Sequence, residues 1–249
     1  MSRPRLHDTL IKLFETRDQA ILNECLNHSE FGEFLKENEL EIPVDKLVSA
    51  FTHTSFHHEY QAPHQELLEF LGDSVLQLII TEELLKLHPQ EKEGRLSKMR
   101  SSIVNEDVLA KLALNLGLNQ MLLVGKGEFR KGLHLNSSTL ADTMEALISQ
   151  IYQYHGFEKT RDIVLRWIRE FSPNLFDLSS LEEFDSKSRL QEMSLARYKQ
   201  LPTYKSEDLG GRFKVSVWIK DQLITQGEFH SKKIGERELA REIINKKLI

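Results

Sequence analysis

Acidic side chains at helical spacing are the residues of this sequence best suited to chemistry. One group is Glu66, Glu69 and Asp73, and a second pair is Asp142 and Glu145. At about 100° per residue the first three fall within an arc of about 60°, and the second pair are neighbours at i, i+3. Carboxylate oxygens from two helices suit hard divalent cations such as Mg²⁺, which can activate water and stabilise the leaving oxygen of a phosphodiester.

Acids at this spacing also occur on ordinary solvated helix surfaces, and for Asp142 and Glu145 taken alone that is the plainer interpretation. The first group carries a stronger signal, because large apolar residues surround its acids and Gly72 lies in mid-helix. A mid-helix glycine costs about 1 kcal/mol relative to alanine. That cost is expected where a neighbouring helix or a ligand must come close.

Two long helices are predicted to carry the acids. The first spans residues 65–87 and has a predicted buried stripe of Leu67, Leu68, Leu71, Val75, Leu78 and Ile79. The second starts after the possible N-caps Ser137 and Ser138 and reaches about Tyr154. Its predicted buried residues are Leu140, Met144, Leu147, Ile148 and Ile151. If the two stripes pack together, four or five carboxylates converge.

The remaining pattern before residue 175 is also helical. Short amphipathic helices are expected within residues 1–40, and further helices over 47–56, 96–116 and 158–171. The glycine-containing segment 125–132 lacks the Lys-Ser/Thr of a phosphate-binding loop, so it is predicted to be a turn. A loop over 56–64 is rich in histidine. We interpret its residues as capping and packing groups, because zinc sites usually show tighter pairings: His53, His57, His58 and His64.

The pattern changes after a polar linker. A helix is predicted over 188–199, and Phe213–Lys220 alternates as a half-buried strand does. Leu223–Phe229 is predicted to pair with it as a hairpin. Ser231 is the predicted cap of a final helix that reaches about Leu248. The residues predicted to face inward from that helix are Ile234, Leu239, Ile243 and Ile244.

Charge is divided unevenly along the chain. Residues 185–249 hold 14 basic and 9 acidic residues, whereas the preceding part holds 19 basic and 29 acidic residues. A basic module beside an acidic one suits a polyanion held over a metal site. The single cysteine, Cys25, excludes an internal disulfide and a cysteine-built zinc site. No apolar run has membrane-spanning length and no secretory signal is evident, so a cytoplasmic protein without membrane partners is expected.

Three segments together resemble the ribonuclease III family of endoribonucleases. They are Glu66-Leu-Leu-Glu-Phe-Leu-Gly-Asp-Ser-Val-Leu76, Leu140-Ala-Asp-Thr-Met-Glu-Ala-Leu-Ile148 and Glu93-Gly-Arg-Leu-Ser-Lys-Met-Arg100. The resemblance implies an all-α endonuclease domain at 31–174, after an N-terminal extension at 1–30. By the same likeness the metal ligands are Glu69, Asp73, Asp142 and Glu145, of which Asp73 and Glu145 are catalytic, and the accessory acids are Glu66 and Glu93. The departures, which remove no ligand, are Gln65 for the family's Asn, Leu133 for one of two paired glycines and Ser149 for Gly.

After a linker at 175–184, residues 185–249 resemble a double-stranded-RNA-binding domain, a small α+β fold of α-β-β-β-α order. The likeness implies that Gln191 and Glu192 face a minor groove, and that Lys232 and Lys233 bind phosphate at a helix N-terminus. The hairpin loop lacks the usual His, and Arg212 is its candidate RNA contact. Two further departures are Gly235, where Ala is usual, and Phe229, where Gly is common.

Taken together, the resemblance implies a homodimeric endoribonuclease that depends on Mg²⁺, with Mn²⁺ as a substitute. It would hydrolyse double-stranded RNA to 5′-phosphate and 3′-hydroxyl ends and process structured precursors such as ribosomal RNA. The alternative is a catalytically silent double-stranded-RNA-binding or ribosome-associated protein on the same scaffold. Retention of all four ligand carboxylates counts against that alternative.

Overall fold

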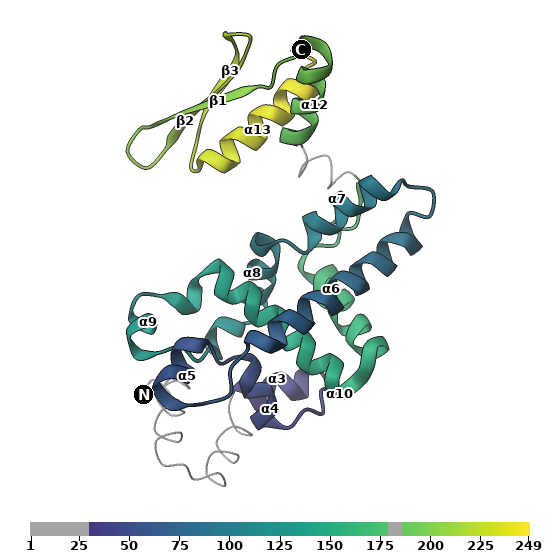
Figure 1. Cartoon of the computed structure of the whole chain (residues 1–249), viewed down its shortest axis with the longest axis vertical. Helices are drawn as coiled ribbons and strands as arrows, with labels where there is room; N and C mark the ends of the chain where they lie inside the picture. Colours follow the sequence, from purple (N-terminus) through teal and green to yellow (C-terminus); the bar gives the residue numbers. More distant parts are fainter. Residues whose placement is uncertain (1–29, 179–185) are drawn as a thin grey trace. The chain divides into compact units, whose positions relative to one another are not determined.

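The computed structural model describes residues 30–178 and 186–249 (Figure 1). The chain forms two compact units that divide after Leu175, and each is described by itself. The helices expected before residue 30 and most of the expected linker lie outside the described residues.

The described part of the first unit is helical, as predicted. Two long helices, α6 (Glu66–Leu87) and α10 (Ser137–Phe171), pack against each other, and α8 (Glu106–Asn115) packs on α10 (Figure 1). The remaining elements are shorter and connect or cover these three: α3 (Glu30–Glu37), α4 (Val44–Ala50), α5 (Thr54–Tyr60), α7 (Glu93–Ile103), η1 (Leu118–Gln120), α9 (Lys126–Arg130) and η2 (Leu133–Leu135).

The buried face of α10 agrees with the prediction. All five predicted residues, Leu140, Met144, Leu147, Ile148 and Ile151, are buried. The predicted break before residue 158 is also present, because Gly156 has φ 75° and ψ 178° and interrupts the helical geometry. Glycine reaches this backbone conformation without the steric cost that a side chain brings.

The buried face predicted for α6 is confirmed at Val75 and Ile79, which are buried, but it is wrong at Leu67 and Leu78. Leu67 is 81% exposed and Leu78 is 51% exposed, whereas Leu76, Ile80 and Leu84 are buried. The true buried face is rotated by about a quarter turn from the predicted one. Apolar residues surround this helix on nearly every side, so periodicity alone does not identify the side that meets α10.

The first part of the histidine-rich segment forms a helix rather than the predicted loop, and residues 61–64 after it are not helical, as predicted. The predicted helix 47–56 ends at Ala50, and α5 begins at Thr54. His53 is the N-cap of α5, and its ring nitrogen accepts a hydrogen bond from the backbone N–H of Ser55 at 3.1 Å. Nδ1 of His57 lies 2.6 Å from the carbonyl oxygen of Ala62. These capping and packing contacts agree with the predicted role of the two histidines.

Asparagine side chains set two helix starts that the sequence interpretation misplaced. The predicted helix 96–116 is divided into α7 and α8, because Asn105 caps α8 by accepting the N–H of Val108 at 3.1 Å. The N-cap of α10 is Asn136, not Ser137 or Ser138, and it accepts the N–H of Thr139. In the segment 125–132, the predicted turn is the short helix α9 followed by Gly132 at φ 81°.

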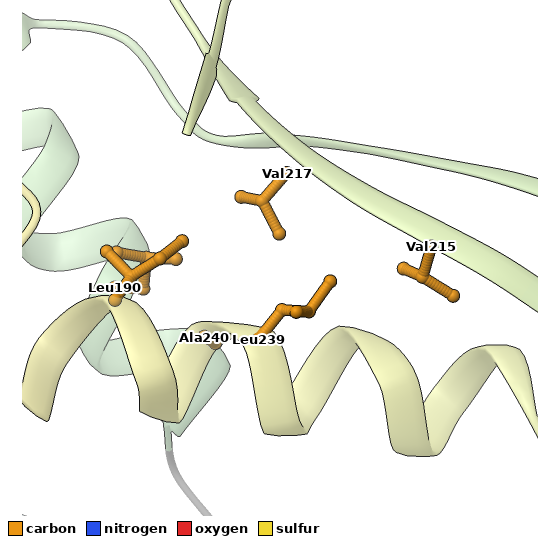
Figure 2. Close-up of a cluster of buried hydrophobic side chains, with 6 residues drawn as sticks. Leu190, Val215, Val217, Leu239 and Ala240 are labelled. Atoms are coloured by element: carbon orange, nitrogen blue, oxygen red, sulfur yellow. The ribbon is translucent and has the colours of Figure 1, made fainter. Parts of the chain in front are cut away.

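The second unit has the predicted α-β-β-β-α order. Helix α12 (Ser186–Tyr198) precedes an antiparallel sheet of β1 (Thr203–Asp208), β2 (Phe213–Ile219) and β3 (Gln222–Phe229), and α13 (Lys232–Asn245) follows it. Val215 and Val217 project from β2 toward α13 (Figure 2). The core that they form with the two helices is Leu190, Val215, Val217, Leu239, Ala240 and Ile243. Both helices therefore cover one face of the sheet.

Two details of α13 differ from the prediction. Ser231 occupies the N-cap position but makes no side-chain capping hydrogen bond, and Ile234 is exposed rather than inward. The position that faces the sheet is Gly235. A Cβ there would lie 2.6 Å from Cδ2 of Phe229 and 2.7 Å from Cγ2 of Val215. The large Phe229 ring therefore occupies the space that the missing side chain leaves.

Candidate functional site

The two acid-bearing helices meet at Gly72. A Cβ at this position would overlap the backbone carbonyl oxygen of Glu145 and would lie 3.1 Å from its Cα. The close approach expected from a mid-helix glycine is therefore present, and the neighbour is the backbone of α10. Because backbone meets backbone, the crossing point is set next to an acidic residue on each helix, Asp73 and Glu145.

Three carboxylates from the two helices converge at this crossing. One oxygen each from Glu69, Asp142 and Glu145 lies within 4.8 Å of the other two. In the part of the chain that the structure describes, these three form the one group of histidine, cysteine or acidic residues with the spacing of a metal site.

The carboxyl groups of the cluster hold protons more tightly than isolated acids. Burial, followed by the charges of Asp73, Glu69 and Asp142, raises the pKa of Glu145 to about 8. Burial is also the main cause that raises the pKa of Glu69, and its neighbour Asp142 adds to this shift. Burial and then Glu106 raise the pKa of Asp142. A bound cation would remove this repulsion, since it favours the ionised form of each group.

Asp73 lies outside the group of three. Its two carboxylate oxygens accept hydrogen bonds from Nε2 of Gln77 at 2.9 and 3.0 Å. Its charge nevertheless contributes to the raised pKa of Glu145. The i, i+4 spacing of Gln77 from Asp73 is the signal from which this contact could have been predicted.

The two predicted accessory acids lie in different places. Glu66 is exposed in the first turn of α6, with a carboxylate oxygen 3.9 Å from Nδ1 of His64. Glu93 begins α7, accepts a hydrogen bond from Ser97 and lines a pocket of about 440 Å³. The other residues of this pocket are Thr81, Leu84, Leu85, Glu91, Leu96, Ser97 and Arg100. Leu84 is eleven residues beyond Asp73, or about 16 Å along α6, so the structure does not bring Glu93 to the cluster.

The predicted RNA-binding residues of the second unit are all exposed. Gln191 and Glu192 lie on α12, and Lys232 and Lys233 form the first turn of α13. Nζ of Lys232 lies 5.1 Å from the centre of the Phe213 ring. The Arg212 guanidinium donates to the carbonyl oxygen of Glu228 at 3.3 Å. Gln191, Glu192, Lys232 and Lys233 lie on the two helices that cover one face of the sheet. A ligand that approaches this face of the unit can therefore reach them.

The donor set of the acidic cluster fits a hard divalent cation. All three groups offer oxygen, and oxygens on one octahedral Mg²⁺ lie about 2.9 Å apart when adjacent and about 4.2 Å apart when opposite. The observed separations within 4.8 Å therefore need little adjustment. A soft metal would instead require the thiolate or imidazole ligands that this cluster lacks.

Comparisons with known families cover both units. Residues 45–171 match the family model described as Ribonuclease-III-like, and residues 186–247 match the double-stranded RNA binding motif. Ribonuclease 3 of Acinetobacter baumannii strain AYE is 37% identical over 235 residues, which cover 92% of this chain and 97% of that protein. Ribonuclease 3 of Corynebacterium jeikeium K411 is 36% identical over 234 residues, covering 92% and 94%.

Solved structures resemble the first unit. The nuclease domain of ribonuclease III from Campylobacter jejuni has 36% sequence identity and a TM-score of 0.54, covering 58% of this chain and 97% of that one. A second structure of that domain, described for flexibility in a region involved in dimer formation, has 37% identity and a TM-score of 0.53 and covers 56% and 96%.

No helix among the described residues is long and apolar enough to span a membrane. The helical unit, which contains the acidic cluster, corresponds to the first matched family, and the α-β-β-β-α unit corresponds to the second. Agreement with the curated relatives extends over nearly their whole length. The chain therefore belongs to the ribonuclease III family and is an endoribonuclease, a hydrolase with a double-stranded-RNA-binding domain.

Proposed function

We propose that the chain hydrolyses phosphodiester bonds of double-stranded RNA in a Mg²⁺-dependent reaction that leaves 5′-phosphate and 3′-hydroxyl ends. The observation that carries the proposal is the convergence of Glu69, Asp142 and Glu145 from two helices within 4.8 Å. Bound Mg²⁺ lowers the pKa of water and stabilises the charge of a leaving oxygen, and Mn²⁺ has similar ligand preferences.

The proposed ligands are Glu69, Asp73, Asp142 and Glu145, with Asp73 and Glu145 nearest the reaction. Burial and the neighbouring charges raise the pKa of Glu145 to about 8, and Gly72 lets its backbone pack against α6. Asp73 would exchange its contact with Gln77 for the metal or its water. Glu66, exposed one turn before Glu69, is proposed as an accessory group for the solvated metal shell.

The second unit is proposed to hold the duplex. Lys232 and Lys233 add two cations to the amide groups at the start of α13, and this combination attracts phosphate. Gln191 and Glu192 are exposed polar groups on α12 and suit the hydroxyls and base edges of a minor groove. Arg212 is proposed as the contact of the loop between β1 and β2.

A homodimer is part of the proposal, because cutting both strands of a duplex requires two sites. Leu67, Phe70, Leu78 and Leu85 are exposed large apolar residues at helical spacing on α6, and such a stripe favours contact with a partner. Leu78 lies midway between Phe70 and Leu85. An antiparallel α6–α6 contact centred near Leu78 would set Phe70 against the pocket of the second copy. Glu93 would then serve the cluster of that second copy.

The dimer is tested by a charge placed on the stripe. Phe70→Glu is expected to convert the protein to a monomer in sedimentation at micromolar concentration, because the contact would bury an unpaired carboxylate. Leu114→Glu, at another exposed leucine on α8, is the control and should sediment as the wild type does. A dimer that survives Phe70→Glu would contradict the α6 contact.

The substrates are proposed to be structured precursors such as ribosomal RNA in the cytoplasm, on the strength of family membership alone. The nuclease proposal is tested with long duplex RNA in Mg²⁺ and in EDTA. Duplex cleavage is expected only with the metal. The Glu145→Ala variant should not cleave, but in EDTA it should bind the duplex with wild-type affinity. The Lys232→Ala/Lys233→Ala variant should show the opposite loss, with weaker binding and a salt slope reduced by about 2.

Cleavage of duplex RNA in EDTA, or full activity of Glu145→Ala, would overturn the assignment of the cluster. Unchanged RNA affinity of the double lysine variant across salt concentrations would overturn the assignment of α13.

A further inference from the structure

One buried polar contact joins the two acid-bearing helices beside the cluster. The hydroxyl of Thr143 on α10 donates to Oε1 of Gln65 at 3.2 Å. Gln65 is 3% exposed and Thr143 is fully buried. The same hydroxyl proton also has the carbonyl oxygen of Thr139 as a nearer acceptor at 2.7 Å, so the two oxygens share it and Thr143 is satisfied even without Gln65. The contact is therefore not required to satisfy Thr143, and its role must be sought elsewhere.

Gln65 is tied to the acids of α6 through its backbone. Its carbonyl oxygen accepts the N–H of Glu69 at 2.9 Å, in the turn that carries that carboxylate. Its own N–H donates to the carbonyl oxygen of Thr52 at 3.0 Å, and Thr52 is fully buried. The backbone of Gln65 is thus held by hydrogen bonds to buried Thr52 and to Glu69, and its side chain extends from this fixed backbone.

Thr143 is placed correspondingly on α10. It follows Asp142 directly and precedes Glu145 by two residues. The Gln65–Thr143 contact therefore spans the short gap between the turn of Glu69 and the turn of Asp142 and Glu145. Mutual repulsion of these carboxylates acts to separate the same two turns, and a direct hydrogen bond between them opposes that separation.

We propose that Gln65 is a positioning residue that, through Thr143, fixes the spacing of Glu69 from Asp142 and Glu145 and thereby sets the affinity of the cluster for Mg²⁺. This inference rests on the proposed metal-binding function. Groups that orient metal ligands typically change metal affinity by 10–100-fold when they are lost, although they never touch the metal.

The same helix supplies a matched control. Nε2 of Gln150 on α10 donates to Oγ of Ser49 on α4 at 3.1 Å, and Gln150 is 4% exposed. This is a second buried glutamine–hydroxyl contact between α10 and another helix, and it involves no residue of the acidic cluster. If loss of a buried amide only loosens the fold, Gln65→Met and Gln150→Met will have similar effects.

The experiment measures Mg²⁺ binding by calorimetry on the full chain without RNA, together with the Mg²⁺ concentration for half-maximal duplex cleavage. Gln65→Met and Thr143→Val should each weaken Mg²⁺ binding about 10-fold and raise that concentration by a similar factor. Excess Mg²⁺ should restore most of the maximal rate. Thr143→Ser, which keeps the hydroxyl, and Gln150→Met should both stay within about twofold of wild type.

Wild-type Mg²⁺ affinity in both Gln65→Met and Thr143→Val would overturn the inference, and so would an equal loss in Gln150→Met. If Gln65→Met fails to fold, Thr143→Val decides the question, because it removes the same contact while leaving Gln65 in place. Failure of the wild-type protein to bind Mg²⁺ at all would instead refute the proposed function, and that result is visible before any variant is made.

Discussion

Each unit has a glycine within a helix at a point of close contact, but the contacts differ in kind. Gly72 of the nuclease unit lies against the backbone of Glu145, whereas Gly235 of the RNA-binding unit lies against the side chains of Phe229 and Val215. A backbone carbonyl within a long helix cannot move without moving the helix. A phenylalanine ring can be exchanged for a smaller side chain, which relieves the contact locally.

The contrast follows from what each unit must do. The acidic cluster depends on oxygen atoms from α6 and α10 lying within a few ångströms, so the helix spacing there leaves little tolerance. The second unit presents exposed polar groups to a ligand that is read mainly by shape. Its core combines Gly235 with Phe229, two departures from the expected pattern whose groups lie in direct contact.

The largest effect is expected for Gly72→Ala. The new methyl group would overlap the carbonyl of Glu145, so α6 and α10 must separate and the carboxylates must move apart. Cleavage should fall at least 100-fold, since misplacement of about 1 Å can cost that much. Duplex cleavage and Mg²⁺ binding would be measured on the folded fraction, with circular dichroism as the check on folding.

Gly94 on α7 is the matched control, because nothing lies within 4 Å of the place where its Cβ would be. Gly94→Ala should leave cleavage unchanged and should stabilise α7 slightly, given the helix propensity of alanine. Full activity of Gly72→Ala would break the comparison between the two glycines.

A smaller effect is expected for Gly235→Ala. Overpacking against Phe229 costs roughly 1–3 kcal/mol, and the better helix propensity of alanine offsets about 1 kcal/mol of this. The expected net loss is on the order of 1 kcal/mol in the unfolding free energy of this unit, measured by urea denaturation. Adding Phe229→Leu should recover part of the loss, and a strictly additive double variant would show that the two positions do not compensate.

The smallest effect is expected for Glu145→Gln in EDTA. The pKa of Glu145 is raised to about 8 from the ordinary 4.5, so its stabilising contribution is fully present below pH 4.5 and is lost as the pH rises through 8. Glutamine does not ionise. The variant should therefore melt at a higher temperature than wild type at pH 8.5, and the difference should shrink toward pH 5.

With Mg²⁺ the wild type should melt at a higher temperature than Glu145→Gln, because only the wild-type cluster gains the full binding energy of the ion. The same pH dependence of melting temperature in both proteins would contradict the raised pKa of Glu145.

The sequence was informative where a pattern permits one interpretation. The buried residues of α10, a break between Tyr154 and Glu158 and the alternating strand β2 follow from periodicity, and the structure confirms them. The mid-helix position of Gly72 also predicted that a neighbouring helix or ligand comes close, although only the structure identifies the neighbour as Glu145.

The failures have specific causes. On α6, Leu67 and Leu78 are as apolar as the residues that pack on α10, so the helical period did not separate an exposed stripe from a core stripe. Asn105 and Asn136 each begin a helix through one side-chain hydrogen bond, a local effect that apolar periodicity does not register. The contact of Gln65 with Thr143 joins positions 78 residues apart and has no local signature.

The bend at Gly156 divides α10 into two halves that make different contacts. Beyond it, Nε1 of Trp167 donates to Oδ1 of Asn38 at 2.8 Å, and Lys159 donates to the carbonyl oxygen of Glu39. This distal half therefore anchors the chain that enters the nuclease unit, while the proximal half carries Asp142 and Glu145. Because the bend interrupts the helical geometry between them, the two halves of α10 do not form one continuous helix. The proposed metal ligands and the contacts to Asn38 and Glu39 are therefore held by separate segments of the same element.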